Sequence, residues 1–268
     1  MHHSIPALGL GTWGRTGAGG REAILAALEI GYRHLDTAQS YGTEANVGAA
    51  VRACGLPRGD VFVTTKVADT NLDRSRFEPS LRRSLDTIGL GPVDLTLIHW
   101  PSHGDAVPFE HYIEALATAR EAGLTRLIGV SNFPIALIDR AVMIVGEGAL
   151  ATNQVEIHPF LQNRALTAHC RDLGIGVTAY MPLAQGRVPG DPVLEAVAAK
   201  HGATAAQVAL AFLLAHDIIV IPASGSRAHL EENFGASGVT LDGEDLGRIA
   251  ALDRGMRIID PPKAPDWD

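Results

Sequence analysis

Lysine is scarce in this chain: only Lys66, Lys200 and Lys263 occur among its 268 residues. Acidic residues outnumber lysine and arginine together, which gives a formal net charge of −8, and no segment gathers basic residues into a cluster. A protein that binds nucleic acid needs such a cluster to neutralise phosphate groups. The composition therefore argues against a nucleic-acid partner.

Cysteine and long apolar runs are also few. Cys54 and Cys170 are too few for a disulfide framework and lack the spacing of metal ligands, which indicates a reducing compartment. The N-terminus has no basic stretch followed by a long apolar run, and the longest apolar stretch, near 208–223, is interrupted by His216 and Asp217. We therefore expect a cytoplasmic protein that has no membrane partner and acts as a monomer.

The chain does have short apolar, β-branched runs that alternate regularly with helical patterns. These runs predict strands at 32–36, 61–66, 93–99, 125–130, 151–156, 176–180 and 218–222, and an eighth with a weaker pattern at 238–240. The helical patterns lie at 43–54, 75–88, 109–121, 134–145, 164–173, 192–215 with a break at Gly202, 227–235 and 243–252. Eight βα units of this length predict an α/β fold, a (β/α)8 TIM barrel that forms a single domain over residues 1–268.

A glycine motif near the N-terminus suggests a different fold. Gly9, Gly11 and Gly14 match the dinucleotide-binding pattern G-x-G-x-x-G, and Asp36 follows at the usual separation of about twenty residues. That pattern requires a strand before the first glycine and a helix that opens at the third, whereas here Pro6 interrupts the preceding residues and the helix waits until about Arg21. We interpret the glycines as a loop that closes the barrel.

Four polar residues lie at or just after consecutive strand ends: Asp36, Tyr41, Lys66 and His99. In a barrel these ends share one face, so the four side chains are expected to meet. A carboxylate keeps a buried lysine charged, and that cation lowers the pKa of a nearby tyrosine. The tyrosine then serves as a general acid, while the histidine orients the oxygen that receives the proton. The alternative is structural: an Asp–Lys pair fills the barrel floor and Tyr41 only caps it.

At these residues the chain resembles the aldo-keto reductase family, and specifically its small bacterial members that act like 2,5-diketogluconate reductases. The matching segments cover nearly the whole chain: IPALGLGTWG, GYRHLDTAQSYGTEANVG, TTK, DLTLIHWP, IGVSNF, NQVEIHP, AYMPLAQG and HLEENF. The resemblance implies a (β/α)8 barrel that binds a nicotinamide cofactor in an extended pose and passes hydride to a carbonyl carbon. It also implies that Tyr41 is the general acid, that Lys66 and Asp36 tune it, and that His99 positions the carbonyl oxygen.

The same resemblance assigns the nicotinamide site and the substrate pocket. Ser131, Asn132 and Gln154 would bind the carboxamide, Tyr180 would stack on the ring, and Leu183 would lie where the backbone cradles the cofactor. Trp13 and Trp100 match aromatic residues of the substrate pocket. Each of these residues also has a plain structural reading, as a helix cap, a satisfied polar group or a packed aromatic ring.

Departures from the family pattern concern the cofactor's 2′-phosphate. Ala223 stands where the family usually has lysine, and His229 stands where it usually has arginine. The residues left for this end of the cofactor are Ser224, Arg227, Glu232 and Asn233, with Ser226 nearby. We therefore expect NADP(H) to be modestly favoured and NAD(H) to be accepted. The N-terminal hairpin is truncated and the C-terminal tail is short, which suggests an open substrate mouth.

Two other functions fit parts of the sequence. His34 and Asp36 face the same side of one strand and, with Lys66, His99 and His158, would suit a metal-dependent hydrolase; the family segments explain these residues without a metal, so we expect none. A barrel that binds cofactor as a sensor or regulatory subunit is the second alternative, which the presence of all four catalytic candidates disfavours. The favoured interpretation is an enzyme that reduces small aldehydes or ketones.

Overall fold

Eight parallel strands follow one another around a barrel in the order of the chain. The computed structural model describes residues 5–268. The strands are β1 (Leu10–Gly11), β2 (His34–Asp36), β3 (Phe62–Val67), β4 (Val93–Ile98), β5 (Thr125–Ser131), β6 (Leu150–Glu156), β7 (Gly176–Tyr180) and β8 (Ile218–Val220). A parallel bridge between Leu8 and Val220 joins the two edges of the sheet, so the ring closes. The predicted (β/α)8 architecture is confirmed.

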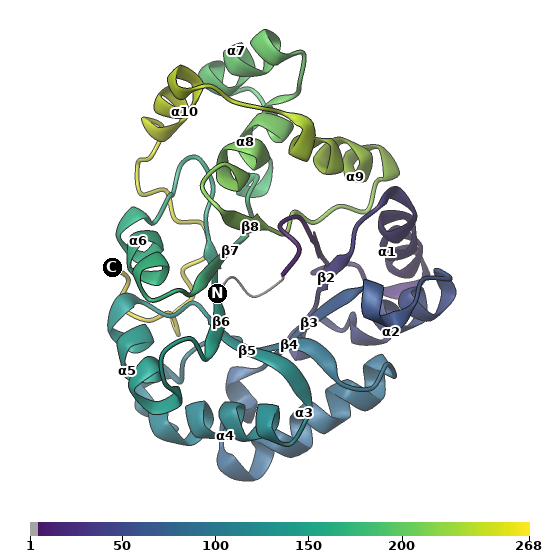
Figure 1. Cartoon of the computed structure of the whole chain (residues 1–268), viewed down its shortest axis with the longest axis vertical. Helices are drawn as coiled ribbons and strands as arrows, with labels where there is room; N and C mark the ends of the chain where they lie inside the picture. The colour runs from purple at the N-terminus through teal and green to yellow at the C-terminus, as the bar shows by residue number, and fades with distance from the viewer. Residues whose placement is uncertain (1–4) are drawn as a thin grey trace.

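Helices surround this ring, as Figure 1 shows. They are α1 (Gly17–Ile30), α2 (Glu44–Ala53), α3 (Arg74–Ile88), α4 (Phe109–Glu121), α5 (Ile135–Val145), α6 (Arg164–Asp172), α7 (Pro192–His201), α8 (Ala205–Leu214), α9 (Arg227–Phe234) and α10 (Gly243–Ala250). The predicted break at Gly202 is confirmed, because this glycine adopts a φ of 60° and ends α7. Thr204 then starts α8 with a capping box.

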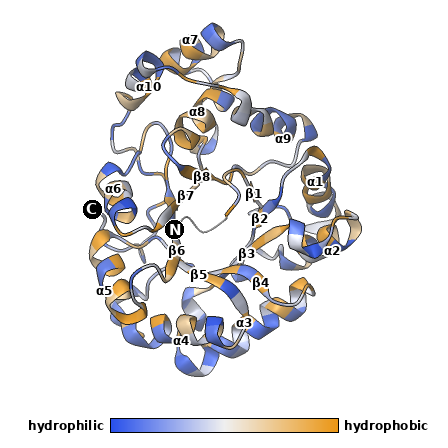
Figure 2. Cartoon of the chain, viewed as in Figure 1, coloured by the Kyte–Doolittle hydropathy of each residue, from blue (hydrophilic) through white to orange (hydrophobic). Residues whose placement is uncertain are grey.

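Most strand residues are buried because helices cover one side of the sheet and packed side chains fill the other. Every residue of β3 and β6 is buried. Figure 2 shows hydrophilic residues on the outer helices α3 and α4, whereas α5 is strongly apolar. Within residues 5–268, no single helix is long and apolar enough to cross a membrane, and only the bent pair α7 and α8 meets that test when its helices are taken together.

The prediction of the eighth strand at 238–240 is wrong. A short 3-10 helix, η6, occupies Gly235–Gly238, and the following residues form no strand. The strand that was not predicted is β1, a pair of residues inside the glycine-rich loop. Helix α1 also begins at Gly17, before the position near Arg21 that the sequence suggested.

The glycines of this loop allow close packing rather than dinucleotide binding in a Rossmann fold. A Cβ on Gly9 would lie 2.7 Å from Nδ1 of His34, and a Cβ on Gly11 would lie 2.8 Å from the carbonyl oxygen of Ile221. Any larger residue would push β1 away from β2 or from the end of β8. The predicted closing role of this loop is confirmed. The predicted hairpin remnant before it falls partly on residues 1–4, outside the described residues.

Candidate active site

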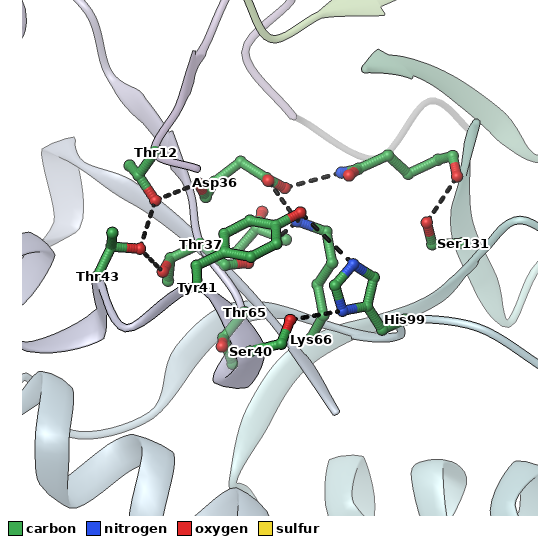
Figure 3. A network of polar contacts seen from close by, with 12 residues as sticks. Thr12, Asp36, Thr37, Ser40, Tyr41, Thr43, Thr65, Lys66, His99 and Ser131 are labelled. Atoms are coloured by element: carbon green, nitrogen blue, oxygen red, sulfur yellow. Dashed lines mark hydrogen bonds and ion pairs between the residues drawn. The ribbon is translucent and has the colours of Figure 1, made fainter. Parts of the chain in front are cut away.

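The four catalytic candidates meet at the carboxyl ends of the strands (Figure 3). Asp36 ends β2, Lys66 is the next-to-last residue of β3, and His99 directly follows β4. Tyr41 ends the 3-10 helix η1 (Gln39–Tyr41), which follows β2. Convergence at this face of the barrel is what the spacing of the sequence predicts.

Lys66 forms a buried ion pair with Asp36. Its Nζ donates to Oδ1 of Asp36, to the carbonyl oxygen of Thr37 at 3.0 Å and to the hydroxyl of Tyr41 at 3.4 Å, so each of its three protons has an acceptor. Burial favours the neutral lysine, but the charge of Asp36 and the oxygen of Tyr41 more than offset it and raise the Lys66 pKa. The site therefore holds a permanent cation beside the phenol.

The Tyr41 hydroxyl lies between this cation and the imidazole of His99, whose Nε2 is 3.5 Å away. Burial raises the pKa of Tyr41, and Lys66 acts in the opposite direction. Lys66 lowers the Tyr41 pKa as predicted, but the net direction is upward because the phenol is deeply enclosed, which cannot be seen in the sequence. Tyr41 thus keeps its proton at neutral pH and is able to give it away.

His99 is neutral in this environment. Burial lowers its pKa to about 3, and the cations of Lys66 and Lys263 contribute in the same direction. Its Nδ1 lies 3.4 Å from Oγ of Ser40, and its other ring nitrogen faces Tyr41. A neutral imidazole offers one donor and one acceptor, so His99 can orient an oxygen atom without adding positive charge.

Three threonines fix the loop that carries Tyr41. Thr12 donates its hydroxyl to the carbonyl oxygen of Asp36 at 2.9 Å and lies 2.9 Å from the hydroxyl of Thr43. Thr43 lies 2.8 Å from the hydroxyl of Thr37. These contacts join the loop after β1 to both ends of η1 (Figure 3). Isolated threonines carry no motif, so this support could not be predicted from the sequence.

The predicted nicotinamide residues form one chain of hydrogen bonds beside the four. Tyr180 donates to Oδ1 of Asn132 at 2.8 Å, and Nδ2 of Asn132 donates to the carbonyl oxygen of His99 at 3.0 Å. Ser131 donates to the carbonyl oxygen of Gln154 at 2.8 Å, and the side-chain amide of Gln154 donates to Asp36 at 2.7 Å. Asn132 adopts a φ of 63°, a conformation that costs free energy and is concentrated at functional sites.

A cavity of about 850 Å³ connects these residues with the end of β8. The predicted residues that line it are Trp13, Asp36, Tyr41, His99, Trp100, Ser131, Asn132, Gln154, Tyr180, Leu183, Ser224, His229, Glu232 and Asn233. Trp13 is largely exposed and Trp100 is buried. Arg227 is not among the lining residues: it pairs with Glu29 at 2.9 Å and with Glu231 at 3.1 Å on the outer surface. This placement argues against the predicted role of Arg227 at the phosphate.

A family model described as the aldo/keto reductase family matches residues 7–254. The chain belongs to this family. Methylglyoxal reductase DkgB of Escherichia coli O157:H7 is 46% identical over 266 residues, which cover 99% of this chain and 100% of that protein. An aldo-keto reductase of Mycolicibacterium vanbaalenii is 37% identical and is covered over 93% of its length, with 97% of this chain matched.

Solved structures agree with this assignment. A crystal structure with the provisional name 2,5-diketo-D-gluconic acid reductase B superposes with a TM-score of 0.95 at 42% identity, covering 98% of this chain and 94% of that one. The aldose reductase of Schistosoma japonicum superposes with a TM-score of 0.92 at 31% identity, covering 98% and 96%. As an aldo-keto reductase, the protein is an NAD(P)-dependent oxidoreductase that reduces carbonyl groups to alcohols.

Several residues of this aldo-keto reductase reach the cavity without having been predicted. Arg15 lines it from the loop after β1, and Asp69, Ile259 and Lys263 line it at the rim. Lys263 and Ile259 belong to the C-terminal tail, so this short tail supplies part of the cavity lining. The expectation of a more open mouth stays a prediction. No local signal in the sequence says where an irregular tail will lie.

The residues of the metal-hydrolase alternative have other partners. Nε2 of His34 lies 3.1 Å from the hydroxyl of Thr64, and Nε2 of His158 lies 3.0 Å from Glu156. Across the described part of the chain, no group of three or more His, Cys, Asp or Glu side chains is arranged to hold a metal ion.

Proposed function

We propose that this aldo-keto reductase reduces small aldehydes or ketones with NAD(P)H and that Tyr41 is the general acid. The observation that carries the proposal is the position of the Tyr41 hydroxyl, 3.4 Å from Nζ of Lys66 and 3.5 Å from Nε2 of His99, at one end of the large cavity. Lys66 is the cation that would stabilise the phenolate of Tyr41, and His99 is the neutral imidazole that would orient the oxygen receiving the proton. That arrangement suits delivery of a proton to an oxygen atom.

The cavity has donors and acceptors suited to an extended dinucleotide. Ser131, Asn132 and Gln154 would bind the carboxamide, and Tyr180 would lie against the ring. When bound, the reduced cofactor supplies hydride to the carbonyl carbon. Leu183 would lie along the middle of the cofactor, while Ser224, Glu232 and Asn233 would hold its adenosine end. All of these residues line one continuous cavity, which supports a single elongated ligand.

The chain's own residues handle the proton. A carbonyl oxygen bound between Tyr41 and His99 accepts hydrogen bonds from both, which draws electron density onto the oxygen. As the oxygen gains charge, Tyr41 releases its proton to it. Lys66 stabilises the resulting phenolate, and Asp36 keeps Lys66 charged and in position. Because His99 stays neutral, it holds the oxygen without competing as an acid.

The substrate end of the cavity is partly aromatic. Trp13 and Trp100 line it together with His99 and the rim residues Asp69 and Lys263. Relatives carry the names methylglyoxal reductase and 2,5-diketo-D-gluconic acid reductase B. We take small, polar carbonyl compounds as the substrate class.

We assign the cofactor's phosphates to Arg15 rather than to Arg227. The guanidinium of Arg15 lies over Gly225, where a Cβ would come within 2.3 Å of its Nη1, so glycine leaves room for it. Arg15 lines the same cavity as Ala223, Ser224 and His229. Among residues 5–268 it forms no ion pair with a carboxylate, so its charge is available. One such cation in place of the usual two supports a modest preference for NADPH with use of NADH.

The direct test is multiple-turnover oxidation of NADPH by the purified protein with methylglyoxal as the probe substrate, followed by the absorbance of the reduced cofactor. We expect one alcohol per NADPH consumed. A protein that binds NADPH but consumes none, with a panel of small aldehydes and ketones, would instead be a sensor or regulatory subunit.

A further inference from the structure

Glu156, at the end of β6, is a fully buried carboxylate that takes no part in the reaction described above. Its Oε1 accepts a hydrogen bond from the backbone N–H of Ile258 at 2.8 Å, and its Oε2 accepts one from the N–H of Ile259 at 2.7 Å. Nε2 of His158 lies 3.0 Å from Oε1. Because a carboxylate only accepts hydrogen bonds, His158 must present an N–H there.

The two amides belong to a segment that has no helix or strand of its own, residues 257–268, which we call the C-terminal strap. From Ile259 the strap crosses the cavity mouth, where Ile259 and Lys263 form part of the lining. Nζ of Lys263 reaches Asp69 at 2.7 Å, and the ring of Trp267 packs edge-on against Trp100 with centroids 6.1 Å apart. The strap is thus attached at both sides of the mouth.

The attachment at Glu156 is the stronger of the two. Lys263 and Asp69 are partly exposed, and an ion pair at the surface contributes little because water and salt screen it. Glu156 has no solvent contact, and the free energy needed to bury its charge is offset only if its donors are in place. The donors are two consecutive backbone amides, so the carboxylate fixes the course of the strap whatever side chains it carries.

We propose that Glu156 is a positioning residue that anchors the C-terminal strap as one wall of the substrate pocket. Through the strap it sets the affinity for the carbonyl substrate, while among residues 5–268 its side-chain oxygens make no hydrogen bond to Tyr41 or to the residues proposed to hold the cofactor. This inference rests on the proposed carbonyl reduction, since it assigns the pocket wall of that same site.

The test compares Glu156→Gln with Glu147→Gln, which makes the same change at an exposed position before β6. Glutamine has one acceptor oxygen, so its NH2 group must face one of the two strap amides. We expect KM for methylglyoxal to rise about tenfold or more in Glu156→Gln, the worth of one hydrogen bond to a charged group. We expect kcat and the Kd of NADPH to stay within about twofold of the original protein, and Glu147→Gln to match that protein throughout.

A chain that ends at Met256 tests the strap itself as the pocket wall. It keeps the attachment of Arg254 and Met256 to the carbonyl oxygen of Phe160 but lacks the strap. We expect the KM of the shortened chain to rise at least as much as that of Glu156→Gln. When Glu156→Gln is added to the shortened chain, we expect no further rise in KM. The proposal is overturned if the rises in KM of Glu156→Gln and of the shortened chain multiply when the two changes are combined. It is also overturned if KM is unchanged in either of them alone. If Glu156→Gln does not fold, the KM of the shortened chain decides.

Hydrogen exchange tests the anchor independently of catalysis. The amides of Ile258 and Ile259 should exchange slowly in the original protein and at least about tenfold faster in Glu156→Gln. This result holds even if the protein reduces no carbonyl compound, so failure of the proposed function and failure of the anchor are distinguishable. Equal exchange rates in the two proteins contradict the anchor.

Discussion

Nε2 of Gln154 donates to Oδ2 of Asp36 at 2.7 Å, while Lys66 occupies the other oxygen of the same carboxylate. Asp36 therefore joins the residues that control the proton of Tyr41 to the residue predicted to bind the nicotinamide carboxamide. Both of its oxygens have protein partners, which gives it an orienting role rather than contact with a ligand. The proton site and the proposed hydride site are parts of one buried network.

Replacement of Lys66 by methionine should weaken both stability and activity. Breaking a buried ion pair from one side costs about 3–5 kcal/mol because it leaves the remaining charge without its partner. Burial then raises the Tyr41 pKa without opposition, so any remaining activity should extend to higher pH. Urea unfolding and the pH dependence of kcat check these two effects.

The double variant Asp36→Asn with Lys66→Met is the control for this prediction. It removes both charges, so it should recover a large part of the lost stability while activity stays low. Full activity in the double variant would show that the ion pair only fills the barrel floor.

His99 should make the protein less stable in acid. Its pKa is lowered to about 3 in the folded protein, against an ordinary value of 6.5. Between these values the unfolded chain binds more protons than the folded one, so the free energy of unfolding falls as pH drops below about 6.5. At pH 4.5 the loss due to this one group should be about 2–3 kcal/mol.

Replacement of His99 by asparagine isolates that contribution. The difference in unfolding free energy between the two proteins should change by about 2–3 kcal/mol when urea titrations at pH 7 and pH 4.5 are compared. The same difference at both pH values would mean that His99 is protonated alike in the folded and unfolded states.

The sequence predicted the site well where each strand ends in a polar residue. Asp36, Lys66 and His99 occupy such positions, and strand register brings them together without any knowledge of side-chain packing. Strand β1 could not be predicted in this way, because two residues among glycines have no periodicity. The strand predicted at 238–240 is absent, because an apolar residue between small ones follows a 3-10 helix there.

The features that sequence reasoning missed depend on contacts distant in the chain. Arg15 becomes a candidate phosphate ligand only because Gly225 lies beneath it, and Arg227 becomes a weaker candidate because Glu29 lies beside it. The course of the C-terminal strap depends on Glu156, more than a hundred residues earlier. None of these pairings has a local pattern.

Replacing Arg15 or Arg227 by alanine removes the same charge at two positions, which tests which arginine binds the cofactor's phosphates. Arg15→Ala should raise the Kd of NADPH about tenfold or more, because it removes a charge-assisted contact to phosphate. Arg227→Ala makes the same change in charge at the outer surface and should alter the Kd less than about twofold. Fluorescence titration of the purified variants measures both values.

Titration of the same variants with NADH shows which phosphate Arg15 binds. An equal loss of affinity for both cofactors indicates the diphosphate, and a loss confined to NADPH indicates the 2′-phosphate. Unchanged binding of both cofactors by Arg15→Ala contradicts the assignment. In the original protein we expect NADPH to be favoured by well under about a thousandfold in kcat/KM, which corresponds to roughly 4 kcal/mol.

The central claim is that Tyr41 gives the proton to the carbonyl oxygen, and Tyr41→Phe tests it most directly. Single-turnover and steady-state reduction of methylglyoxal by NADPH should be measured for this variant and the original protein, together with the Kd of NADPH. We expect kcat to fall by about two to four powers of ten, the usual worth of a general acid, with the Kd nearly unchanged. A variant that keeps most of its turnover would contradict the account, because phenylalanine has no proton to give.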